Sequence, residues 1–324
     1  MKKRNTNVLI IALILALALI LEFVYYKYFL TREEQIRQIS LIVYGSDAAR
    51  WENLRQGAEL AARDLNAEVT LITMSSESDA KEQITLIRRE IVNGADGLLI
   101  AACDSDVIGS YLEKHPIGIP YAFVESGPKD EKSQAPLYAA DDQKMAEALL
   151  KNIATNEKDW IKAAVVCDHT ERDSVRKRLN AIMNSDISYA EEVVLWEKNE
   201  QEQHKKAQFF LQRKLTEEAV DVVIAVDNSS MEELLDATVN LNKDIKIYGI
   251  ADSAKSVYYL DKGLIKLLVF QDEFSAGYKA VSDLMGKDRK QPVSTERSLI
   301  RYEMIDHANM YDMAYQKMLF PHLR

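Results

Sequence analysis

The chain has 324 residues, of which 47% are hydrophobic and 28% are charged, with 41 Lys and Arg against 51 Asp and Glu. This length is sufficient for two domain-sized lobes with separate hydrophobic cores. A net charge of -10 argues against a nucleic-acid partner, because phosphate binding depends on clustered Lys and Arg. The five histidines and two cysteines show no spacing typical of a metal site, so we expect no metal and no cofactor.

The N-terminal segment has the pattern of a membrane anchor. Three basic residues among the first four precede a run, Val8 to Leu21, that contains no charge. About 20 apolar residues span a bilayer, and the tyrosines that follow the run are typical of a membrane interface. The sequence Ala16-Leu17-Ala18 resembles a cleavage site but lies inside the run, which favours an uncleaved anchor over a cleaved signal. We expect residues 1–31 to form a cytoplasmic tip and a transmembrane signal anchor, with the soluble domain outside the cytoplasm.

After the anchor, short apolar runs alternate with helical periodicity. The first set of expected strands covers residues 39–44, 69–73, 97–101, 119–124 and 137–140, with helices between them. The second set covers residues 161–167, 192–196, 220–226, 245–250, 264–270 and 299–305, with helices over 172–183, 207–215, 231–239 and 274–284. Nearly continuous apolar strands separated by helices are typical of a parallel sheet covered on both faces. The sequence therefore predicts an α/β protein of two tandem units with a cleft between their sheets.

Hydrogen-bonding side chains follow most of the predicted strands. Ligands of open α/β sheets bind at the carboxyl ends of the strands, so these positions are candidates for a binding site. The candidates are Tyr44, Arg50, Trp51, Asp104, Glu125, Asp142, Asp227, Asp252 and Gln271. Carboxylates and amides bond to neighbouring hydroxyls, and an aromatic face covers the C–H side of a sugar ring. The set favours a polyhydroxylated ligand, while helix capping is the alternative role for each single Asp.

The segment Cys103-Asp104-Ser105-Asp106 contains a thiol, a hydroxyl and two carboxylates directly after the third strand. We expect Asp104 to contact the ligand, Ser105 or Asp106 to cap the next helix, and Cys103 to pack as a small apolar residue.

Motifs of catalysis are missing from the sequence. It contains no G-x-S-x-G elbow, no P-loop and no G-x-G-x-x-G after the first strand. Cys167, Asp168 and His169 are adjacent on an extended segment, where neighbouring side chains point to opposite sides. We therefore expect a binding protein rather than an enzyme.

Four segments follow one another in a familiar order: EIVNGADGLLIAACDSDVIG, ERDSVRKRLNAI, VVIAVDNSSMEELLDA and LLVFQDEFSAGYKAV. With them, residues 39–302 resemble the type I periplasmic binding proteins, in particular the ribose- and galactose-type sugar receptors. The resemblance implies that Asp104 hydrogen-bonds a sugar, that Arg176 grips ring hydroxyls, and that Asp227 and Gln271 contact the ligand. Arg50 stands where an aromatic residue is common, so an anionic or modified sugar would suit Arg50 and Arg176.

The resemblance also implies two Rossmann-like lobes that interleave along the chain and close about a hinge. The first lobe would contain residues 38–141 and 272–294, and the second residues 142–271 and 295–324. The implied function is that of a membrane-anchored, extracytoplasmic solute-binding protein that closes on a sugar-like ligand. It would serve an ABC-type permease or signal to a membrane sensor kinase. The alternatives are a degenerate binding domain with a structural role and a sugar-responsive regulator domain.

Overall fold

The computed structural model describes residues 2–25, 36–128, 135–157, 161–197, 207–239, 241, 243, 245–286 and 298–319. The chain divides into two compact units, residues 1–37 and residues 38–324, which are considered separately. The first unit contains the helix α1 (Lys2–Tyr25), of which residues 13–23 and 25 have described, exposed side chains. Within the described residues, no helix combines the length and the apolar character that crossing a bilayer requires. The anchor predicted over residues 1–31 is therefore not supported by the structure.

The second unit contains two six-stranded sheets. The first has the order β11-β5-β4-β3-β1-β2 and consists of β1 (Arg37–Val43), β2 (Ala67–Thr73), β3 (Gly97–Ile100), β4 (Tyr121–Val124), β5 (Leu137–Ala139) and β11 (Ser298–Leu299). Its helices are η2 (Ala48–Trp51), α2 (Glu52–Asp64), α3 (Ala80–Val92), α4 (Ser105–Lys114) and α10 (Glu273–Gly286). The pairs β1–β3, β3–β4, β4–β5 and β5–β11 are parallel, as predicted for buried apolar strands.

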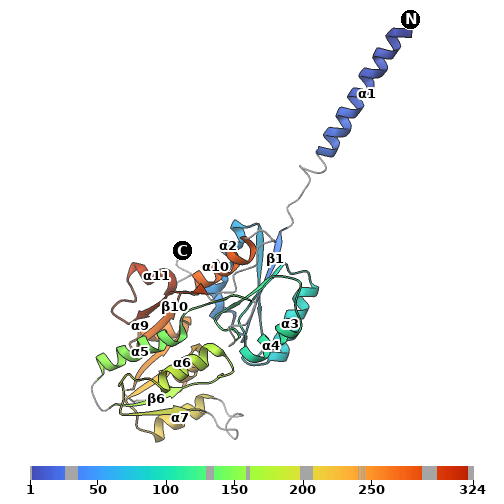
Figure 1. The fold of residues 1–324 in the computed structure, drawn as a ribbon. Coiled ribbons are helices and arrows are strands. Elements are labelled where there is room, and N and C mark those ends of the chain that lie inside the picture. The colour runs from blue at the N-terminus through green and yellow to red at the C-terminus, as the bar shows by residue number, and fades with distance from the viewer. Residues whose placement is uncertain are drawn as a thin grey trace. The chain divides into compact units, whose positions relative to one another are not determined.

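Residue alternation along β1 explains why helices cover both faces of this sheet. Ile39, Leu41 and Val43 face a core formed with α2 and α10, whereas Ile42 faces a second core formed with α3 and α4. Both faces are apolar because successive side chains of a strand point to opposite sides. Figure 1 shows the two helix layers on either side of the sheet.

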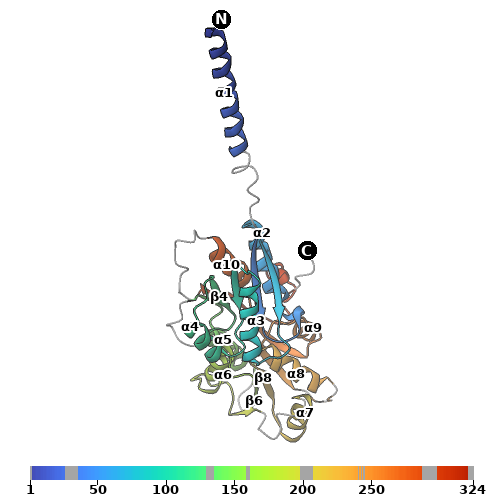
Figure 2. The ribbon, with the colours of Figure 1, turned by 90° about the vertical axis from the view of Figure 1, so that its right-hand side faces the viewer.

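The second sheet repeats this topology with the order β12-β10-β9-β8-β6-β7. Its strands are β6 (Lys162–Val166), β7 (Glu192–Trp196), β8 (Val222–Ala225), β9 (Lys246–Ile250), β10 (Ile265–Gln271) and β12 (Tyr302–Ile305). Its helices are α5 (Asp142–Asn156), α6 (Asp173–Met183), α7 (Ala207–Glu217), α8 (Asn228–Thr238), α9 (Ala254–Asp261) and α11 (Met313–Leu319). Only the pair β10–β12 is antiparallel among the pairs described in this sheet. Figure 2 shows α6, β6, β8 and α8 together in the lower lobe, with α3 and α4 in the upper lobe.

Three chain segments cross between the two sheets. The chain passes from β5 to α5 at residues 140–141, from β10 to α10 at Asp272, and from β11 to β12 at residues 300–301. Backbone hydrogen bonds join the segments, from Ile300 N to Ala139 O (3.0 Å) and from Asp272 N to Arg301 O (2.9 Å). The crossings therefore form one connected hinge, and both lobes are made of separate stretches of sequence.

The third crossing differs from its prediction. Residues 299–305 were expected to form one strand, but β11 pairs with the first sheet and β12 with the second. Ser298 and Leu299 thus belong to the first lobe, and the predicted boundary at 294/295 falls among residues outside the described ranges. The short helices α9 and α11 were not predicted.

Two glycines allow α2 and α10 to pack closely. A methyl group added at Gly57 would overlap the carbonyl oxygen of Phe274, and one at Gly277 would overlap the carbonyl oxygen of Leu54. Because α10 follows the second crossing, this contact holds the returning chain against the first lobe.

We expect Gly57→Ala to lower the free energy of unfolding by about 1–3 kcal/mol, because the added methyl group must push two backbones apart. Gly286→Ala, at the end of α10, is the matched control, since nothing lies within 4 Å of its added methyl group. Urea unfolding of the full chain would measure both changes. Equal stability of the two variants would contradict the close packing.

Candidate functional site

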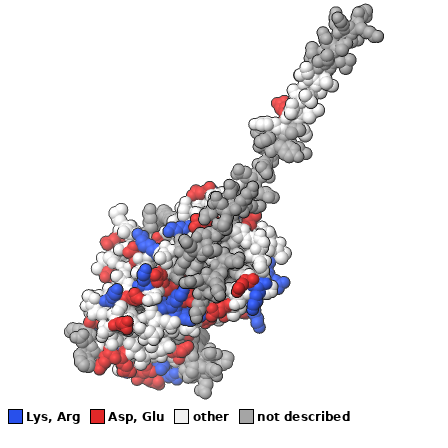
Figure 3. All heavy atoms as spheres, in the orientation of Figure 1, with Lys and Arg blue, Asp and Glu red and all other residues white. Residues whose placement is uncertain are grey.

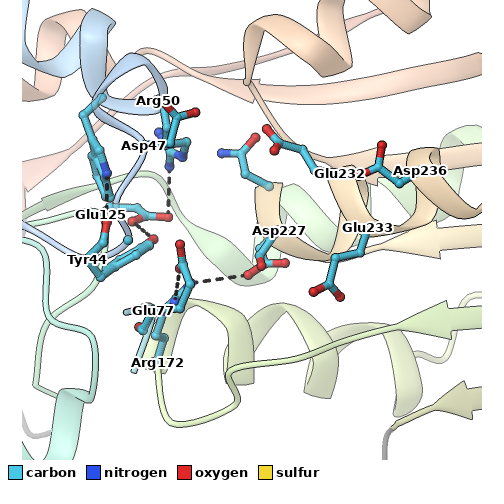
Figure 4. Close-up of a pocket in the computed structure, with 14 residues that line it drawn as sticks. Tyr44, Asp47, Arg50, Glu77, Glu125, Arg172, Asp227, Glu232, Glu233 and Asp236 are labelled. Atoms are coloured by element: carbon cyan, nitrogen blue, oxygen red, sulfur yellow. Dashed lines mark hydrogen bonds and ion pairs between the residues drawn. The ribbon is translucent and has the colours of Figure 1, made fainter. Parts of the chain in front are cut away.

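A cavity of about 200 Å³ lies between the carboxyl ends of the two sheets. Its walls come from the loops after β1 and β2, the turn after β4, the segment between β6 and α6, and helix α8 (Figure 4). It is lined by Tyr44, Gly45, Asp47, Arg50, Trp51, Glu77, Glu125, Arg172, Asp227, Asn228, Ser229, Glu232, Glu233 and Asp236. The β1/β3 and β6/β8 neighbours are the points where strand order reverses in each sheet, which is where open α/β sheets bind ligands.

Guanidinium groups cover one face of each aromatic ring in the cavity. The Cζ of Arg172 lies 3.6 Å from the ring centre of Tyr44, and the Cζ of Arg50 lies 4.3 Å from the ring centre of Trp51. The two rings meet edge to face at 4.9 Å, and Trp51 Nε1 donates to Tyr44 O at 3.1 Å. The rings therefore hold the arginines by cation–π contact. A sugar that stacks on Tyr44 or Trp51, as the sequence predicts, would need a ring face that is not covered by an arginine.

Arg50 joins carboxylates of both lobes. It lies 2.8 Å from Glu273, 3.4 Å from Glu125 and 3.5 Å from Asp252, and all four side chains are at most 9% exposed. Burial raises the pKa of Glu273 well above its ordinary value, and the negative charges of Asp252 and Glu125 add to this although Arg50 opposes it. Because these side chains are buried, a charge without a partner would be costly. Arg50 and its carboxylate partners are therefore stable only when they are all present.

Arg172 reaches from the second lobe into the first. Its side chain is 1% exposed, and its Nη2 donates to the backbone oxygen of Glu77 at 2.8 Å and pairs with the Glu77 carboxylate. Its Nη1 lies 3.5 Å from Asp227 Oδ2. Among the described residues, neither Arg172 Nε nor Asp227 Oδ2 has a hydrogen-bond partner, although both atoms are buried. Buried polar atoms are seldom left unpaired, so these two mark where a ligand would bond.

Glu125 enters the cavity from a strained turn. Its backbone has φ 60°, and Ser126 N donates to Val124 O at 2.6 Å, which closes a γ-turn around it. A positive φ is costly for a residue with a side chain and persists where the surrounding structure requires it. The carboxylate accepts a hydrogen bond from Tyr44 Oη. Burial raises the pKa of Tyr44, and the nearby Glu125 carboxylate raises it further, so the phenol keeps its proton.

Contacts between the lobes close one side of the cavity. The helix α6 has Arg172 at its N-cap position and no cap from its own side chain. Ser105 of the first lobe supplies the acceptor instead, because Asp173 N donates to Ser105 Oγ at 2.9 Å. The backbone of Ser105 also donates to Glu171 O at 3.1 Å. One lobe therefore caps a helix of the other.

The structure brings half of the predicted site residues to the cavity wall. These are Tyr44, Arg50, Trp51, Glu125 and Asp227. Two more lie behind Arg50: Asp252 pairs with it directly, and Gln271 Nε2 donates to Glu273 Oε1 at 3.4 Å. Asp227 combines the two roles that the sequence left open, since its Oδ1 caps α8 through Ser230 N and its Oδ2 remains in the cavity.

The other three predicted residues lie outside the cavity lining. Asp104 Oδ1 accepts from the backbone of Asp106 and Val107, so Asp104 itself caps α4. The expected cap at Ser105 or Asp106 is wrong, because Ser105 is used across the lobes. Cys103 is fully buried in the first core, as expected, and burial raises the pKa of its thiol to about 12.

Arg176, to which the resemblance assigned a ligand contact, lies outside the cavity lining. Arg176 is 23% exposed and pairs with Asp173 (3.0 Å) and Asp106 (3.5 Å), whereas Arg178 forms a buried pair with Asp142 at 3.0 Å. Asp142 is thereby engaged at the start of α5. Of the three arginines that the sequence offers here, only Arg172 lines the cavity.

Several residues that shape the site were not predicted from the sequence. Glu77, Glu232 and Glu233 lie in polar stretches like many others in the chain, and Glu273 follows the predicted site residue Gln271 by two positions. Within the described ranges, no group of three or more His, Cys, Asp or Glu side chains is arranged to hold a metal ion.

A family model described as "Periplasmic binding protein domain" matches residues 39–287, which is most of the chain. The chain belongs to the periplasmic binding protein family. Solved structures of other proteins agree with the fold of this family member. An ABC transporter solute-binding protein of Agrobacterium vitis with bound D-fucose has a TM-score of 0.78 at 18% identity, over 87% of this chain and all of that chain.

Two further structures have the same fold. A carbohydrate transporter solute-binding protein of Agrobacterium radiobacter in complex with D-arabinose has a TM-score of 0.77 at 16% identity, over 89% of this chain and all of that chain. The XylFII–LytSN complex has a TM-score of 0.66 at 18% identity, over 84% of this chain and 98% of that chain. No curated protein sequence matches the chain. Because the family and these neighbours are binding proteins, the expectation of a binding protein rather than an enzyme is confirmed.

The described surface of this periplasmic binding protein mixes both charges. On the face shown in Figure 3, Lys and Arg are interspersed with Asp and Glu, and acidic side chains gather along the lower edge. The described part of this face therefore carries no basic field of the kind that nucleic-acid binding requires.

His169 lies in the segment between β6 and α6, which also carries Arg172. Its pKa reports on the contacts of this segment. Burial lowers its pKa, but the hydrogen bond with Glu171 at 3.0 Å and the charge of Asp227 raise it above its ordinary value, against the opposing charge of Arg172. A histidine whose pKa is raised by folding stabilises the fold fully below its ordinary pKa, and this contribution is lost as the pH rises through the raised value.

We expect Glu171→Gln to lower the pKa of His169 and to reduce the loss of thermal stability between about pH 6 and about pH 8. An NMR titration of the imidazole, with melting curves at both pH values, would measure this. Glu113→Gln, at an exposed position of α4, is the control and should change neither. An unchanged titration in Glu171→Gln would contradict the role given to this pair.

Proposed function

We propose that this protein is an extracytoplasmic solute-binding protein that closes on a sugar or sugar derivative. The observation that carries the proposal is a pair of buried polar atoms, Arg172 Nε and Asp227 Oδ2, that have no hydrogen-bond partner among the described residues, in a cavity between two hinged lobes. A ligand hydroxyl can accept from Arg172 Nε and donate to Asp227 Oδ2. Such a ligand satisfies both atoms at once, and an apolar ligand satisfies neither.

The density of hydrogen-bonding groups supports a polyhydroxylated ligand. Most of the residues that line the cavity carry polar or charged side chains, and a ligand that fails to match a buried polar group leaves it unpaired at a cost of about 1–3 kcal/mol. The ligands named for similar structures, D-fucose, D-arabinose and myo-inositol, are all of this kind. These similarities are below 25% identity, so they support the class of ligand and leave its identity to experiment.

Ligand binding would favour the closed arrangement of the lobes. The cavity wall combines residues of the first lobe, such as Tyr44 and Glu125, with Arg172 and Asp227 of the second. A ligand that bonds to both walls has more contacts when the hinge is closed, and this difference in affinity shifts the population toward closure.

The closed protein would deliver its ligand to an ABC-type permease or report it to a membrane partner such as a sensor kinase. Similar structures support both roles, since two are described as transporter solute-binding proteins and XylFII is solved in complex with LytSN. The second candidate function is a degenerate binding domain with a structural role, which the ion pairs already formed between the lobes favour.

Sugar binding can be tested with the full chain in mild detergent, against pentoses, hexoses, sugar acids and phosphosugars in a thermal-shift screen. For any sugar that raises the melting temperature, we expect Arg172→Lys to weaken binding by about 10- to 100-fold, because it removes Nε and the planar fork. Arg176→Lys is the matched control and should bind as the native chain does. No shift with any member of the panel would favour the degenerate domain.

We also propose that the N-terminal segment attaches the protein to the cell membrane, with the soluble unit outside the cytoplasm. The proposal depends on the uncharged run from Val8 to Leu21 behind three basic residues. In cell fractionation the full chain should sediment with membranes and resist extraction by high salt. A variant lacking residues 8–21 should become soluble, and a native chain extracted by salt alone would refute membrane insertion.

A further inference from the structure

The cavity has a large excess of negative charge. Seven of its fourteen lining residues are carboxylates and two are arginines. The carboxylates are Asp47, Glu77, Glu125, Asp227, Glu232, Glu233 and Asp236. A ligand that enters this space therefore meets more negatively charged side chains than positively charged ones.

Neither arginine is available to a ligand anion. Arg50 already lies within 3.5 Å of three carboxylates, and Arg172 within 3.5 Å of the carboxylates of Glu77 and Asp227. An anion would have to displace these partners, and it would leave them buried and unpaired. Arg176, which together with Arg50 suggested an anionic sugar, lies outside the cavity and pairs with Asp106 and Asp173.

The excess charge concentrates on the wall formed by α8. Glu232, Glu233 and Asp236 follow one another along this helix, across the cavity from Arg50 (Figure 4). Asp236 has a counter-charge outside the lining, since Lys255 Nζ lies 2.6 Å from its Oδ1. At the start of the same helix is Asp227, which is 3% exposed and whose Oδ2 has no hydrogen-bond partner among the described residues.

Figure 4 places Asp227 between Arg172 and Glu233, at the junction of two kinds of wall. On one side are Arg172, Tyr44 and Glu125, which suit hydroxyl groups. On the other are the α8 carboxylates, which suit a donor that carries positive charge. Asp227 Oδ2 lies 3.5 Å from Arg172 Nη1 but accepts no hydrogen bond among the described residues. An ammonium group would supply that hydrogen bond, and a charged hydrogen bond is about twice as strong as a neutral one.

We propose that the ligand carries an ammonium group beside its hydroxyls, as an amino sugar or an aminopolyol does, and that the cavity rejects sugar acids and phosphosugars. This inference rests on the proposed function and specifies the ligand class of the same site. The ammonium group bonds to Asp227 and faces the α8 carboxylates, while the hydroxyls face Arg172, Glu125 and Tyr44. Rejection of acids follows because a ligand anion would meet the carboxylates that line the cavity, and like charges oppose each other.

The experiment is a calorimetric titration of the full chain in mild detergent with two matched series. Each series contains the neutral sugar, its 2-amino form, its N-acetylated form and its uronic acid, based on glucose in one and on galactose in the other. In at least one series the amino sugar should bind at least about tenfold more tightly than its neutral parent, a difference of about 1.4 kcal/mol. The N-acetylated form, which keeps the nitrogen but not the charge, should lose this advantage. Added salt should weaken binding of the amino sugar more than binding of the neutral sugar.

Two variants locate the preference in the cavity. Asp227→Asn keeps a side chain that caps α8 well, and it removes the negative charge. Asp227→Asn and Glu233→Gln should each reduce the ratio of amino-sugar to neutral-sugar affinity. Glu217→Gln, at an exposed position of α7 outside the cavity, is the control and should leave the ratio unchanged.

The outcomes separate this inference from the proposed function. Equal binding of neutral and amino sugars, or tighter binding of a uronic acid, would overturn the ligand charge and leave sugar binding intact. An amino-sugar preference that survives in both cavity variants would overturn the assignment to Asp227 and α8. If no member of either series binds, and the wider sugar panel also fails, the proposed function is overturned together with this inference.

Discussion

Burying a guanidinium group costs several kcal/mol unless charges and hydrogen bonds replace the water it loses. Arg172 meets this requirement only between the lobes, where it is 1% exposed against the ring of Tyr44, the backbone and carboxylate of Glu77, and Asp227. Three of these contacts require the first lobe to lie against the second. The position of the cavity and the identity of its free polar atoms both depend on this one buried side chain.

The need to pair each buried charge also explains how a site with more carboxylates than arginines remains stable. Arg50 compensates three carboxylates, and Tyr44 donates to one of them, so that the first-lobe wall is held by mutual pairing. The carboxylates of α8 stand apart from this set and face the remaining space. Polar groups that pair with one another fix the shape of the site, whereas Arg172 Nε and Asp227 Oδ2, which have no hydrogen-bond partner among the described residues, mark where a ligand would bond.

Closure has a structural basis beyond the ligand. The capping of α6 by Ser105 and the pairing of Arg50 with Asp252 link the lobes through the protein's own groups. Opening of the hinge would break each contact, and water would then replace it at small net cost. The protein's own contacts and those of a ligand therefore act on the same equilibrium, and the ligand needs to supply only the difference between the open and closed states.

Residue periodicity predicted the strands and most helices because apolar alternation is a local property. Ile39, Leu41 and Ile42 reveal a strand buried on both faces without knowledge of its neighbours. The division of residues 298–305 between two sheets was not predictable in this way, since β11 and β12 are both short and only their partners distinguish them. The return of α10 to α2, made possible by Gly57 and Gly277, likewise depends on a contact between distant segments.

The sequence by itself determined the class of fold, the two-lobed arrangement and the polar character of the strand ends, among them Tyr44, Arg50, Trp51, Glu125 and Asp227. Only the tertiary structure decided which arginine of α6 enters the cavity, because Arg172, Arg176 and Arg178 are alike in sequence. Their burial and partners differ because the helix meets solvent, its own lobe and the opposite lobe at successive positions. The charge of the site also depends on the tertiary structure, because its carboxylates come from separate segments of the chain that meet only in the folded protein.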